Sequence, residues 1–309
     1  MQLQTKHLLT IRDLLPQEVL GLVQRALELK AALKAGGHER PLAGKSLALI
    51  FDKPSTRTRV SFEVGIAQLG GTSLFMTSQD SQLGRDEPLK DTARVMSRYV
   101  DCMVVRTFGQ EVLTELARYA DIPVINALSD LYHPCQVLSD LLTVREKLGQ
   151  VHGLAYAWVG DGNNMAHSWL EAAACLGLKL RLACPPGFTP EDAIVAHAQA
   201  KGAEVQLTTD PAEAVAGAQV INTDVWASMG QEKDAQRRRE LFEGYTVDKR
   251  LLSLAAEEAI VLHCLPAHRG QEISEEVLEG PRAVVWDQAE NRLHMQKAIM
   301  EALLTGKAS

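Results

Sequence analysis

Residues 55–58, called the anion loop below, combine three hydroxyl groups with a guanidinium: Ser55, Thr56, Arg57 and Thr58. They lie where the apolar run 46–51 gives way to a helical segment. Ser55 is a suitable N-cap, and the amides in the first turn of a helix attract a phosphate dianion. Alone, S-T-R predicts only a capped helix with a solvated turn, but two arginines beside three hydroxyl residues favour an anion site. The segment matches neither a Walker loop nor G-x-G-x-x-G, so neither ATP nor NAD is favoured.

Two more polar positions follow strand-like runs. Arg106 ends the run 102–106, where it would be a second cation for a phosphate. After the run 123–127, a helical segment opens with a mixed group of side chains: His133, Pro134, Cys135 and Gln136. Taken alone, this group predicts a capped helix start with a satisfied histidine. Its place after a strand, like that of the anion loop, makes it a candidate for the same site.

The second half of the chain carries groups suited to an amino acid. The stretch D-G-N-N at 161–164 lacks the third glycine of a dinucleotide fingerprint, and its polar amides suit a carboxylate. Asp224 supplies one fixed anion for an ammonium group, while Ser228 and the backbone of Met229 supply donors. The alternative is a surface loop anchored by Trp226, which does not account for this charge arrangement.

His263 and Cys264 follow another apolar run, and the pair is open to two interpretations. One is a metal site, the other a cysteine nucleophile. Zinc would need further close ligands, and His268 is the only obvious one, so we expect neither a metal nor another cofactor.

Together these motifs resemble the aspartate and ornithine carbamoyltransferases. The resemblance runs from about Leu42 to Lys297 and is carried, in the expected order, by F-D-K-P-S-T-R-T-R, H-P-C-Q, S-M-G, H-C-L-P and E-N-R. It implies transfer of the carbamoyl group of carbamoyl phosphate to the δ-amine of L-ornithine, giving L-citrulline and phosphate, a step of arginine biosynthesis or of the urea-cycle type. The S-M-G loop and the cysteine after His263 favour ornithine over aspartate as acceptor.

The resemblance also implies which residues contact each substrate. For carbamoyl phosphate these are Ser55, Thr56, Arg57, Thr58, Gln82, Arg106, His133, Pro134, Cys135, Gln136, Cys264, Leu265 and Arg292. For ornithine they are Asn164, Asp224, Ser228 and Met229. Catalysis would rest on Arg57, Arg106, His133 and Cys264. No nucleophilic thiolate is needed, because the amine of ornithine attacks the carbamoyl carbon itself.

Gln82 lies in the polar, glycine-containing stretch 77–88, which we expect to be an exposed, mobile loop. In the family an equivalent loop reaches a neighbouring subunit's site, so the resemblance implies a homotrimer or a multiple of trimers.

Two other functions stay open. One is carbamoyl transfer to another amine, such as putrescine or N-acetylornithine. The other is a non-catalytic sensor of a phosphate ligand.

These motifs require elements that place them at the ends of strands. Ten short apolar runs alternate with helical segments: 46–51, 72–76, 102–106, 123–127, 154–160, 178–183, 203–209, 218–223, 259–264 and 282–287. The pattern predicts an α/β protein with two Rossmann-like domains, each a mostly parallel sheet flanked by helices. We place a carbamoyl-phosphate-binding domain at 1–147 and an ornithine-binding domain at 148–309. Helices are expected at 16–35, 134–148 and 288–304, the last packing back on the first domain.

Composition excludes several classes of protein. With 309 residues, 46% hydrophobic and 23% charged, the chain is typical of a globular protein of two domains. A net charge of -7 argues against a nucleic-acid partner. No apolar stretch is long enough for a membrane span, and the first residues lack the apolar core of a secretory signal. The five cysteines lack paired spacings, as is usual for reduced thiols, so we expect a cytoplasmic protein.

Overall fold

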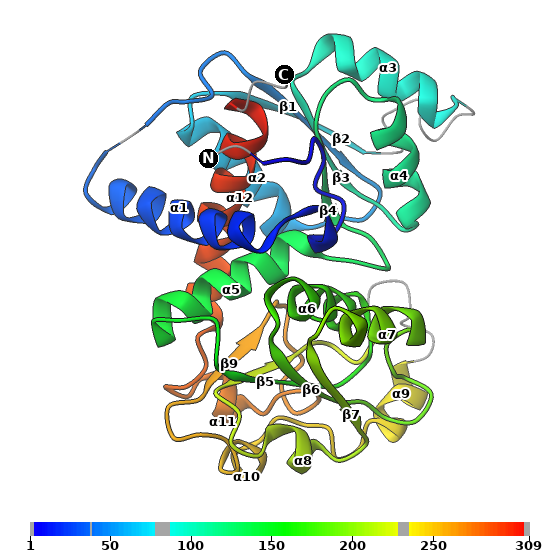
Figure 1. Cartoon of the computed structure of the whole chain (residues 1–309), viewed down its shortest axis with the longest axis vertical. Coiled ribbons are helices and arrows are strands. Elements are labelled where there is room, and N and C mark those ends of the chain that lie inside the picture. Colours follow the sequence, from blue (N-terminus) through cyan, green and yellow to red (C-terminus); the bar gives the residue numbers. More distant parts are fainter. Residues whose placement is uncertain (1–2, 38, 78–86, 228–234, 306–309) are drawn as a thin grey trace. The chain divides into compact units, whose positions relative to one another are not determined.

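The computed structural model describes residues 3–37, 39–77, 87–227 and 235–305. The chain forms two compact units (Figure 1). The first unit comprises Met1–Leu142 and Glu290–Ser309, and the second comprises Thr143–Ala289.

The first unit is built on a four-stranded parallel sheet. Its strands are β1 (Ser46–Phe51), β2 (Thr72–Thr77), β3 (Cys102–Arg106) and β4 (Val124–Leu128), in the order β2-β1-β3-β4. The chain leaves β1 toward β2 on one side, and β3 and β4 extend the sheet on the other. The strand order therefore reverses between β1 and β3, and ligands bind at such a reversal in open parallel sheets.

Helices cover both faces of this sheet (Figure 1). They are α1 (Pro16–Lys34), α2 (Thr56–Gln68), α3 (Leu89–Tyr99), α4 (Gln110–Tyr119) and the start of α5 (Pro134–Leu148), after a short 3-10 helix, η1 (Ile11–Asp13). Alternate strand residues such as Ile50 and Val105 share a core with Met96 of α3 and Leu113 of α4. The runs of β1, β3 and β4 are mostly apolar because both faces of these strands are buried, whereas the edge strand β2 is partly exposed.

The second unit contains a five-stranded parallel sheet. Its strands are β5 (Ala155–Val159), β6 (Lys179–Ala183), β7 (Glu204–Thr208), β8 (Val220–Thr223) and β9 (Ile260–His263), in the order β7-β6-β5-β8-β9. Its helices are α6 (Asn164–Leu176), α7 (Asp192–Ala200), α8 (Pro211–Val215), α9 (Ala235–Leu241), α10 (Lys249–Leu252) and α11 (Glu275–Leu278). Here the order reverses between β5 and β8.

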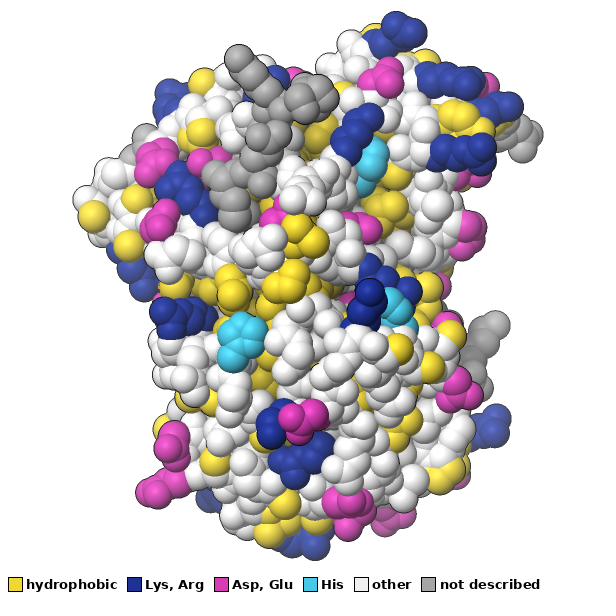
Figure 2. Space-filling model, in the orientation of Figure 1, with side chains coloured by type: hydrophobic (Ala, Val, Ile, Leu, Met, Phe, Trp, Pro, Cys, Tyr) yellow, Lys and Arg dark blue, Asp and Glu magenta, His cyan; other side chains and the backbone are white. Residues whose placement is uncertain are grey.

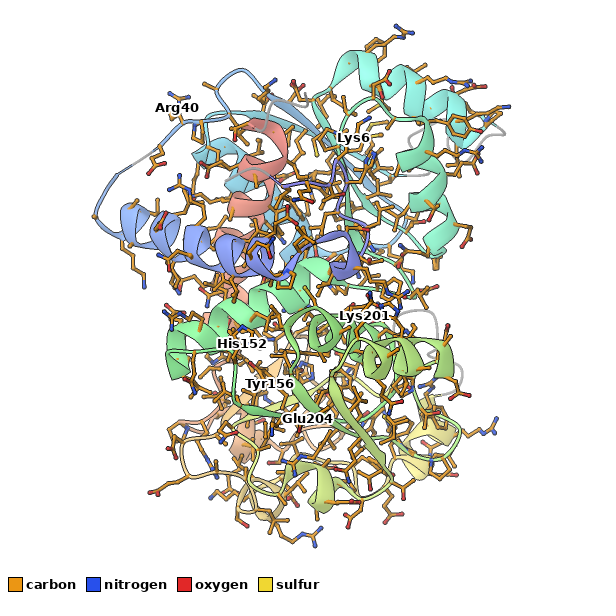
Figure 3. The ribbon with its side chains drawn as sticks, viewed as in Figure 1. Lys6, Arg40, His152, Tyr156, Lys201 and Glu204 are labelled. Atoms are coloured by element: carbon orange, nitrogen blue, oxygen red, sulfur yellow. The ribbon has the colours of Figure 1, made fainter. Side chains whose placement is uncertain are left out.

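Large side chains fill both sides of the second sheet. On one face, Phe242 packs against Phe188, Trp226 and Tyr245. On the other, Tyr156 of β5 packs against Trp169 of α6, with ring centroids 5.3 Å apart. The hydroxyl of Tyr156, labelled in Figure 3, donates to the carbonyl of Val151 over 2.7 Å, so its buried polar end is satisfied.

The strand expected at 282–287 is wrong. Only Ala283 forms a bridge, to Val261 of β9, and helix α12 (Val285–Thr305) begins two residues later. Val284 donates to the carbonyl of Val261, and the next ladder positions are not formed because Gln288 already bonds back to Val284 in a helical turn. A short apolar run has no periodicity that separates a strand from a buried helix start.

The predicted packing of the C-terminal helix on the first part of the chain is confirmed. A Cβ added to Gly65 of α2 would lie 3.1 Å from Cε of Met300, which shows how closely α2 and α12 approach. Arg25 of α1 forms two hydrogen bonds with Glu301, each of 3.0 Å. The predicted α/β class with two parallel sheets is likewise confirmed.

The surface carries charges of both signs. On the side drawn in Figure 2, side chains of Lys and Arg and side chains of Asp and Glu are both present. Within the described residues, no helix has the length and apolar character of a membrane span.

Candidate active site

The anion loop forms the first turn of α2, directly after β1. Ser55 is the N-cap, and its Oγ accepts from the amide of Thr58 over 3.3 Å. The same hydroxyl donates to Oγ1 of Thr58 over 3.0 Å. No acidic residue lies in the first turn, so the positive end of the helix is not neutralised from within. The loop is suited to hold an anion.

The ends of neighbouring strands are tied together beside this loop. The amide of Asp52 donates to the carbonyl of Arg106 over 2.8 Å, and Thr107 donates from its hydroxyl to the Asp52 carboxylate over 2.7 Å. Lys53, which is buried, pairs with Asp130 after β4 and lies 4.1 Å from the ring centroid of Phe108. The loops after β1, β3 and β4 therefore hold one another in place, and Arg106 at the end of β3 is buried.

Arg292 reaches the anion loop from α12. Its Nη2 donates to Oγ1 of Thr58 over 2.7 Å, and both side chains are buried. With bonds arriving from both Ser55 and Arg292, the lone pairs of the Thr58 oxygen are occupied. The hydroxyl proton of Thr58 is then left to donate.

His133 precedes α5 and is a neutral imidazole. Its carbonyl accepts from the amides of Gln136 and Val137 in the first turn of the helix. Burial, with Arg292 and Arg106 nearby, holds the pKa of His133 well below its usual 6.5. The ring therefore acts as a neutral hydrogen-bonding group, not as a cation. Burial likewise raises the pKa of Cys135 to about 12, so that thiol stays protonated.

Gln136 is oriented by its own helix. Its Nε2 donates to Oδ1 of Asp140 over 2.9 Å. Its Oε1 is buried, and no donor in the described part of the chain reaches it. An unsatisfied buried acceptor is costly, so this atom suits a ligand that brings an N–H group.

In the second unit, polar side chains meet at the reversal between β5 and β8. Asn163 caps α6 through its Oδ1, and its Nδ2 donates to Oδ2 of Asp224 over 3.1 Å. Cys264, after β9, donates from Sγ to Oδ1 of Asp224 over 3.1 Å. Both carboxylate oxygens are thus held in fixed directions. Asn164 is the first residue of α6, next to this group.

A second carboxylate lies close by and is held by an arginine. Arg238 of α9 donates to Oδ2 of Asp161 over 2.7 Å and to the carbonyl of Trp226 over 2.6 Å. Burial raises the pKa of Asp161, and Arg238 opposes this shift. The Arg238 guanidinium thus links α9 to the backbone of Trp226 and to the carboxylate of Asp161.

His263 holds the backbone that follows β9. Its Nδ1 accepts from the amide of Leu265 over 2.9 Å, so Nε2 carries the proton and donates to Glu272 over 3.0 Å. Leu265 has a φ of 59°, a left-handed conformation that a leucine adopts only when its surroundings enforce it. The buried His263–Glu272 pair provides that support.

Asp224, His263 and Cys264 bring potential metal ligands within 4.8 Å of one another. Both ring nitrogens of His263 are already engaged, by the amide of Leu265 and by Glu272. A metal would have to break one of these bonds to gain its third ligand. Cys264 is hydrogen-bonded to Asp224, whereas His263 supports the backbone after β9.

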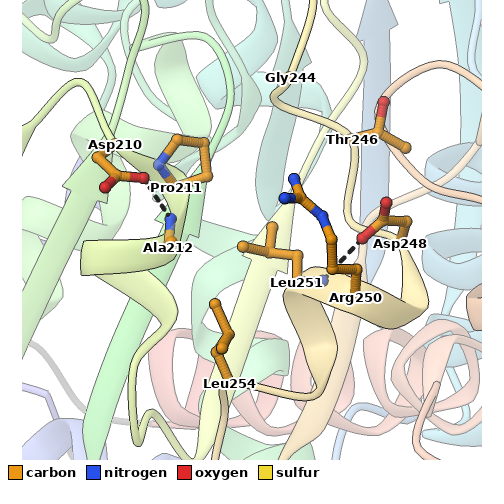
Figure 4. Close-up of a pocket in the computed structure, with 9 residues that line it drawn as sticks. All are labelled: Asp210, Pro211, Ala212, Gly244, Thr246, Asp248, Arg250, Leu251 and Leu254. Atoms are coloured by element: carbon orange, nitrogen blue, oxygen red, sulfur yellow. Dashed lines mark hydrogen bonds between the residues drawn. The ribbon is translucent and has the colours of Figure 1, made fainter.

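The pocket drawn in Figure 4 lies elsewhere on the second unit and has a volume of about 490 Å³. It is lined by Asp210, Pro211, Ala212, Gly244, Thr246, Asp248, Arg250, Leu251 and Leu254. Asp210 and Asp248 are occupied as N-caps of α8 and α10. None of the site residues expected from the sequence is among those that line it.

Comparison with known proteins identifies the family. Residues 6–146 match the carbamoyl-P binding domain of the aspartate/ornithine carbamoyltransferases, and residues 152–303 match their Asp/Orn binding domain. An ornithine carbamoyltransferase of Desulfotalea psychrophila is 58% identical over 96% of this chain and 99% of its own. The chain belongs to the aspartate/ornithine carbamoyltransferase family.

Other members of the carbamoyltransferase family agree over nearly the whole length. The ornithine carbamoyltransferase of Pelobacter propionicus is 56% identical, covering 98% of this chain and 99% of its own. The solved structure of ornithine carbamoyltransferase from Pyrococcus furiosus has a TM-score of 0.93 and 47% identity, and 98% of each chain is covered. That from Campylobacter jejuni has a TM-score of 0.91 and 45% identity, covering 97% of this chain and 99% of the other.

Within this carbamoyltransferase, the described site candidates form two groups. The first unit brings together the anion loop, Arg106, the segment 133–136 and Arg292. The second brings together Asp224, Cys264 and Leu265, with Asn164 beside them. Gln82, Ser228 and Met229 lie outside the described residues, as does most of the stretch 77–88.

Four residues that shape this carbamoyltransferase site had no assigned role in the sequence motifs: Lys53, Asp140, Arg238 and Glu272. Asp140 could have been found, because it lies four residues after Gln136 in a predicted helix, where side chains meet. The amides of D-G-N-N were expected to suit the carboxylate of an amino acid, but the side chain of Asn163 caps α6 and donates to Asp224. Arg238 and Glu272 had no such signal, since their partners lie 77 and 9 residues away.

Proposed function

We propose that this protein transfers the carbamoyl group of carbamoyl phosphate to the δ-amine of L-ornithine, giving L-citrulline and phosphate in arginine biosynthesis or a urea-cycle-type step. The observation that carries the proposal is the hydrogen bond from Arg292 to Thr58 of the anion loop. Arg106 and His133, in the same unit, are buried as well. The names of relatives with 56–58% identity favour ornithine as the acceptor.

In this proposal the first unit binds carbamoyl phosphate. The phosphate would lie at the first turn of α2, with Arg57 and Arg106 neutralising its charge as it leaves. The carbonyl oxygen gains negative charge when the amine attacks, and it would be stabilised by donors from Thr58, Arg106 and neutral His133. The carbamoyl NH2 would donate to Oε1 of Gln136.

The second unit would bind ornithine. Asp224 provides an anion for an ammonium group, and Asn163 and Cys264 fix the direction of its oxygens. Asn164, Ser228 and Met229 would complete the amino-acid contacts. The δ-ammonium must lose one proton to solvent before its nitrogen can attack. As the C–N bond forms and the C–O bond to phosphate breaks, we infer that the departing phosphate takes the second proton from this nitrogen, so no protein base is required. Cys264 would orient the reacting amine.

One assay tests the proposal directly. Citrulline formation from carbamoyl phosphate is measured with ornithine, putrescine, N-acetylornithine and aspartate offered in parallel. We expect ornithine to give the highest kcat/KM. A higher kcat/KM with putrescine or N-acetylornithine would show that this amine, and not ornithine, is the acceptor. A protein that binds carbamoyl phosphate without turning over any amine would support the sensor alternative.

We also propose a homotrimer, or a multiple of trimers, in the cytoplasm. Val60 and Val64 of α2 and Leu74 of the edge strand β2 expose large apolar side chains, with 50%, 39% and 57% of their surfaces accessible, as residues at a subunit contact do in a separated chain. Light scattering of the purified protein gives the mass of the assembly. None of the five cysteines, all of which lie in the described part of the chain, forms a disulfide, as is usual in a reducing compartment.

A further inference from the structure

Gln136 and Asp140 lie one turn apart on α5, and both side chains are buried. Nε2 of Gln136 donates to Oδ1 of Asp140 over 2.9 Å. Oε1 of Gln136 has no hydrogen-bond partner in the described part of the chain. The protein therefore binds one end of this amide and leaves the other end to a ligand.

The carboxylate of Asp140 determines which end of the Gln136 amide, the NH2 or the oxygen, faces the ligand. A carboxylate accepts hydrogen bonds and donates none, so the NH2 end of Gln136 must face it. A primary amide that turns about its last bond exchanges donor for acceptor with almost no change in shape. Without a fixed acceptor at residue 140, either end of Gln136 could face the ligand. With Asp140 in place, the end that faces the ligand is the oxygen.

We propose that Asp140 is a positioning residue that sets the acyl-phosphate specificity of the site, by holding the Gln136 amide so that Oε1 accepts from the carbamoyl NH2. This inference rests on the proposed function of the first unit. A carbamoyl group brings the N–H that the buried oxygen needs. A ligand of the same shape with a methyl group in place of the NH2 would leave Oε1 of Gln136 without a donor. A ligand with a carboxylate oxygen there would place a second acceptor against it.

Two stable phosphonates provide matched probes. Phosphonoacetamide carries an NH2 where phosphonoacetate carries an oxygen, and their P–C bonds are not hydrolysed. The dissociation constant of each is measured by calorimetry for the wild-type protein and for Asp140→Asn. An asparagine at residue 140 can accept or donate, so Gln136 can turn. We expect the preference for the amide over the acid to fall about tenfold, as when one buried hydrogen bond is lost.

Ser139→Ala is the matched control. Ser139 is buried on the same helix, and its Oγ donates to the carbonyl of Cys135 over 2.7 Å. Losing that bond weakens the helix locally but leaves the Gln136 amide bonded to Asp140. We expect the preference between the two phosphonates to stay at its wild-type value in this variant.

Exchanging the two groups gives a stricter test. In the double variant Gln136→Glu with Asp140→Asn, the amide at residue 140 donates to the carboxylate at residue 136, whose second oxygen still faces the ligand as an acceptor. The amide preference should therefore return to within about threefold of wild type, because the buried hydrogen bond is restored. If Asp140→Asn alone does not fold, the double variant is compared with the single variant Gln136→Glu instead. At pH 8 two facing carboxylates repel, so the single variant should bind phosphonoacetamide about tenfold more weakly than the exchanged pair.

The outcomes separate the two proposals. If the wild-type protein binds neither phosphonate, the carbamoyl-phosphate site and this inference fail together. If it binds phosphonoacetamide, and Asp140→Asn keeps the wild-type preference or Ser139→Ala loses it equally, only the role of Asp140 is overturned.

Discussion

Arg292 donates a hydrogen bond to Oγ1 of Thr58 over 2.7 Å, although 234 residues separate them in the chain. Thr58 is 1% exposed and Arg292 is 4% exposed, so the bond is shielded from water. The hydroxyl of Ser55 donates to the same oxygen. A cation from the C-terminal helix thus takes part in the hydrogen bonding at the start of α2.

Replacing this cation tests its part in binding. Arg292→Lys keeps the charge but loses the planar set of donors that reaches Thr58. We expect kcat/KM for carbamoyl phosphate to fall about 100-fold, corresponding to about 3 kcal/mol for one lost donor. Steady-state citrulline assays measure the change. Arg94→Lys, which alters an exposed pair with Asp91 and a contact with the ring of Tyr119, should leave activity unchanged. Normal activity of Arg292→Lys would exclude Arg292 from the site.

Asp224 should contribute to the binding of ornithine and not to the binding of carbamoyl phosphate. Asp224→Asn removes the charge while an amide can still contact Asn163 and Cys264. We expect KM for ornithine to rise about 30-fold, the effect of losing a hydrogen bond to a charged group worth about 2 kcal/mol. KM for carbamoyl phosphate should not change. An equal rise of both constants would contradict the assignment of Asp224 to ornithine.

The neutral state of His133 has a consequence for the pH profile. Because burial and two arginines hold its pKa well below 6.5, the ring does not titrate between pH 6.5 and 8. We expect any inflection of kcat/KM for carbamoyl phosphate in this range to persist in His133→Asn, at lower absolute rates. The idea fails if the wild-type profile has an acid limb near pH 6.5 that the substitution abolishes.

His294 should make stability depend on pH. Burial, with Lys297 and Lys30 nearby, lowers its pKa from 6.5 to about 4, against the opposing effect of Glu290. The unfolded chain therefore binds a proton first as the pH falls, so stability is lost below pH 6.5 until the folded pKa is reached. Between pH 6.5 and 5, the free energy of unfolding should fall about 1.5 kcal/mol more for wild type than for His294→Gln.

Denaturant unfolding at the two pH values measures this difference. His152→Gln is a suitable control, because it replaces a histidine at an exposed position of the second unit. It should show the wild-type dependence on pH. Parallel curves for wild type and His294→Gln would mean that the folded chain protonates His294 as readily as the unfolded chain does.

Local patterns in the sequence were sufficient for much of the fold. Buried parallel strands are short and apolar throughout, so β1, β3 and β5 could be located from composition alone. Because ligands collect at the carboxyl ends of such strands, the anion loop and Asp224 could be selected as candidates before any coordinates were known. The helix α5 was also predicted with the bounds it has.

Only the tertiary structure decided which distant groups meet. The run 282–287 was equally compatible with a strand or a helix start. In the structure a single bridge to Val261 is followed at once by helix α12. Thr58 is bonded to Arg292, which is 234 residues away in the chain. Asp161 is bonded to Arg238, which is 77 residues away. Periodicity reports which face of an element is buried, because burial follows from the element's own geometry. It does not report which side chain from another element will be opposite, since that depends on how the whole chain packs.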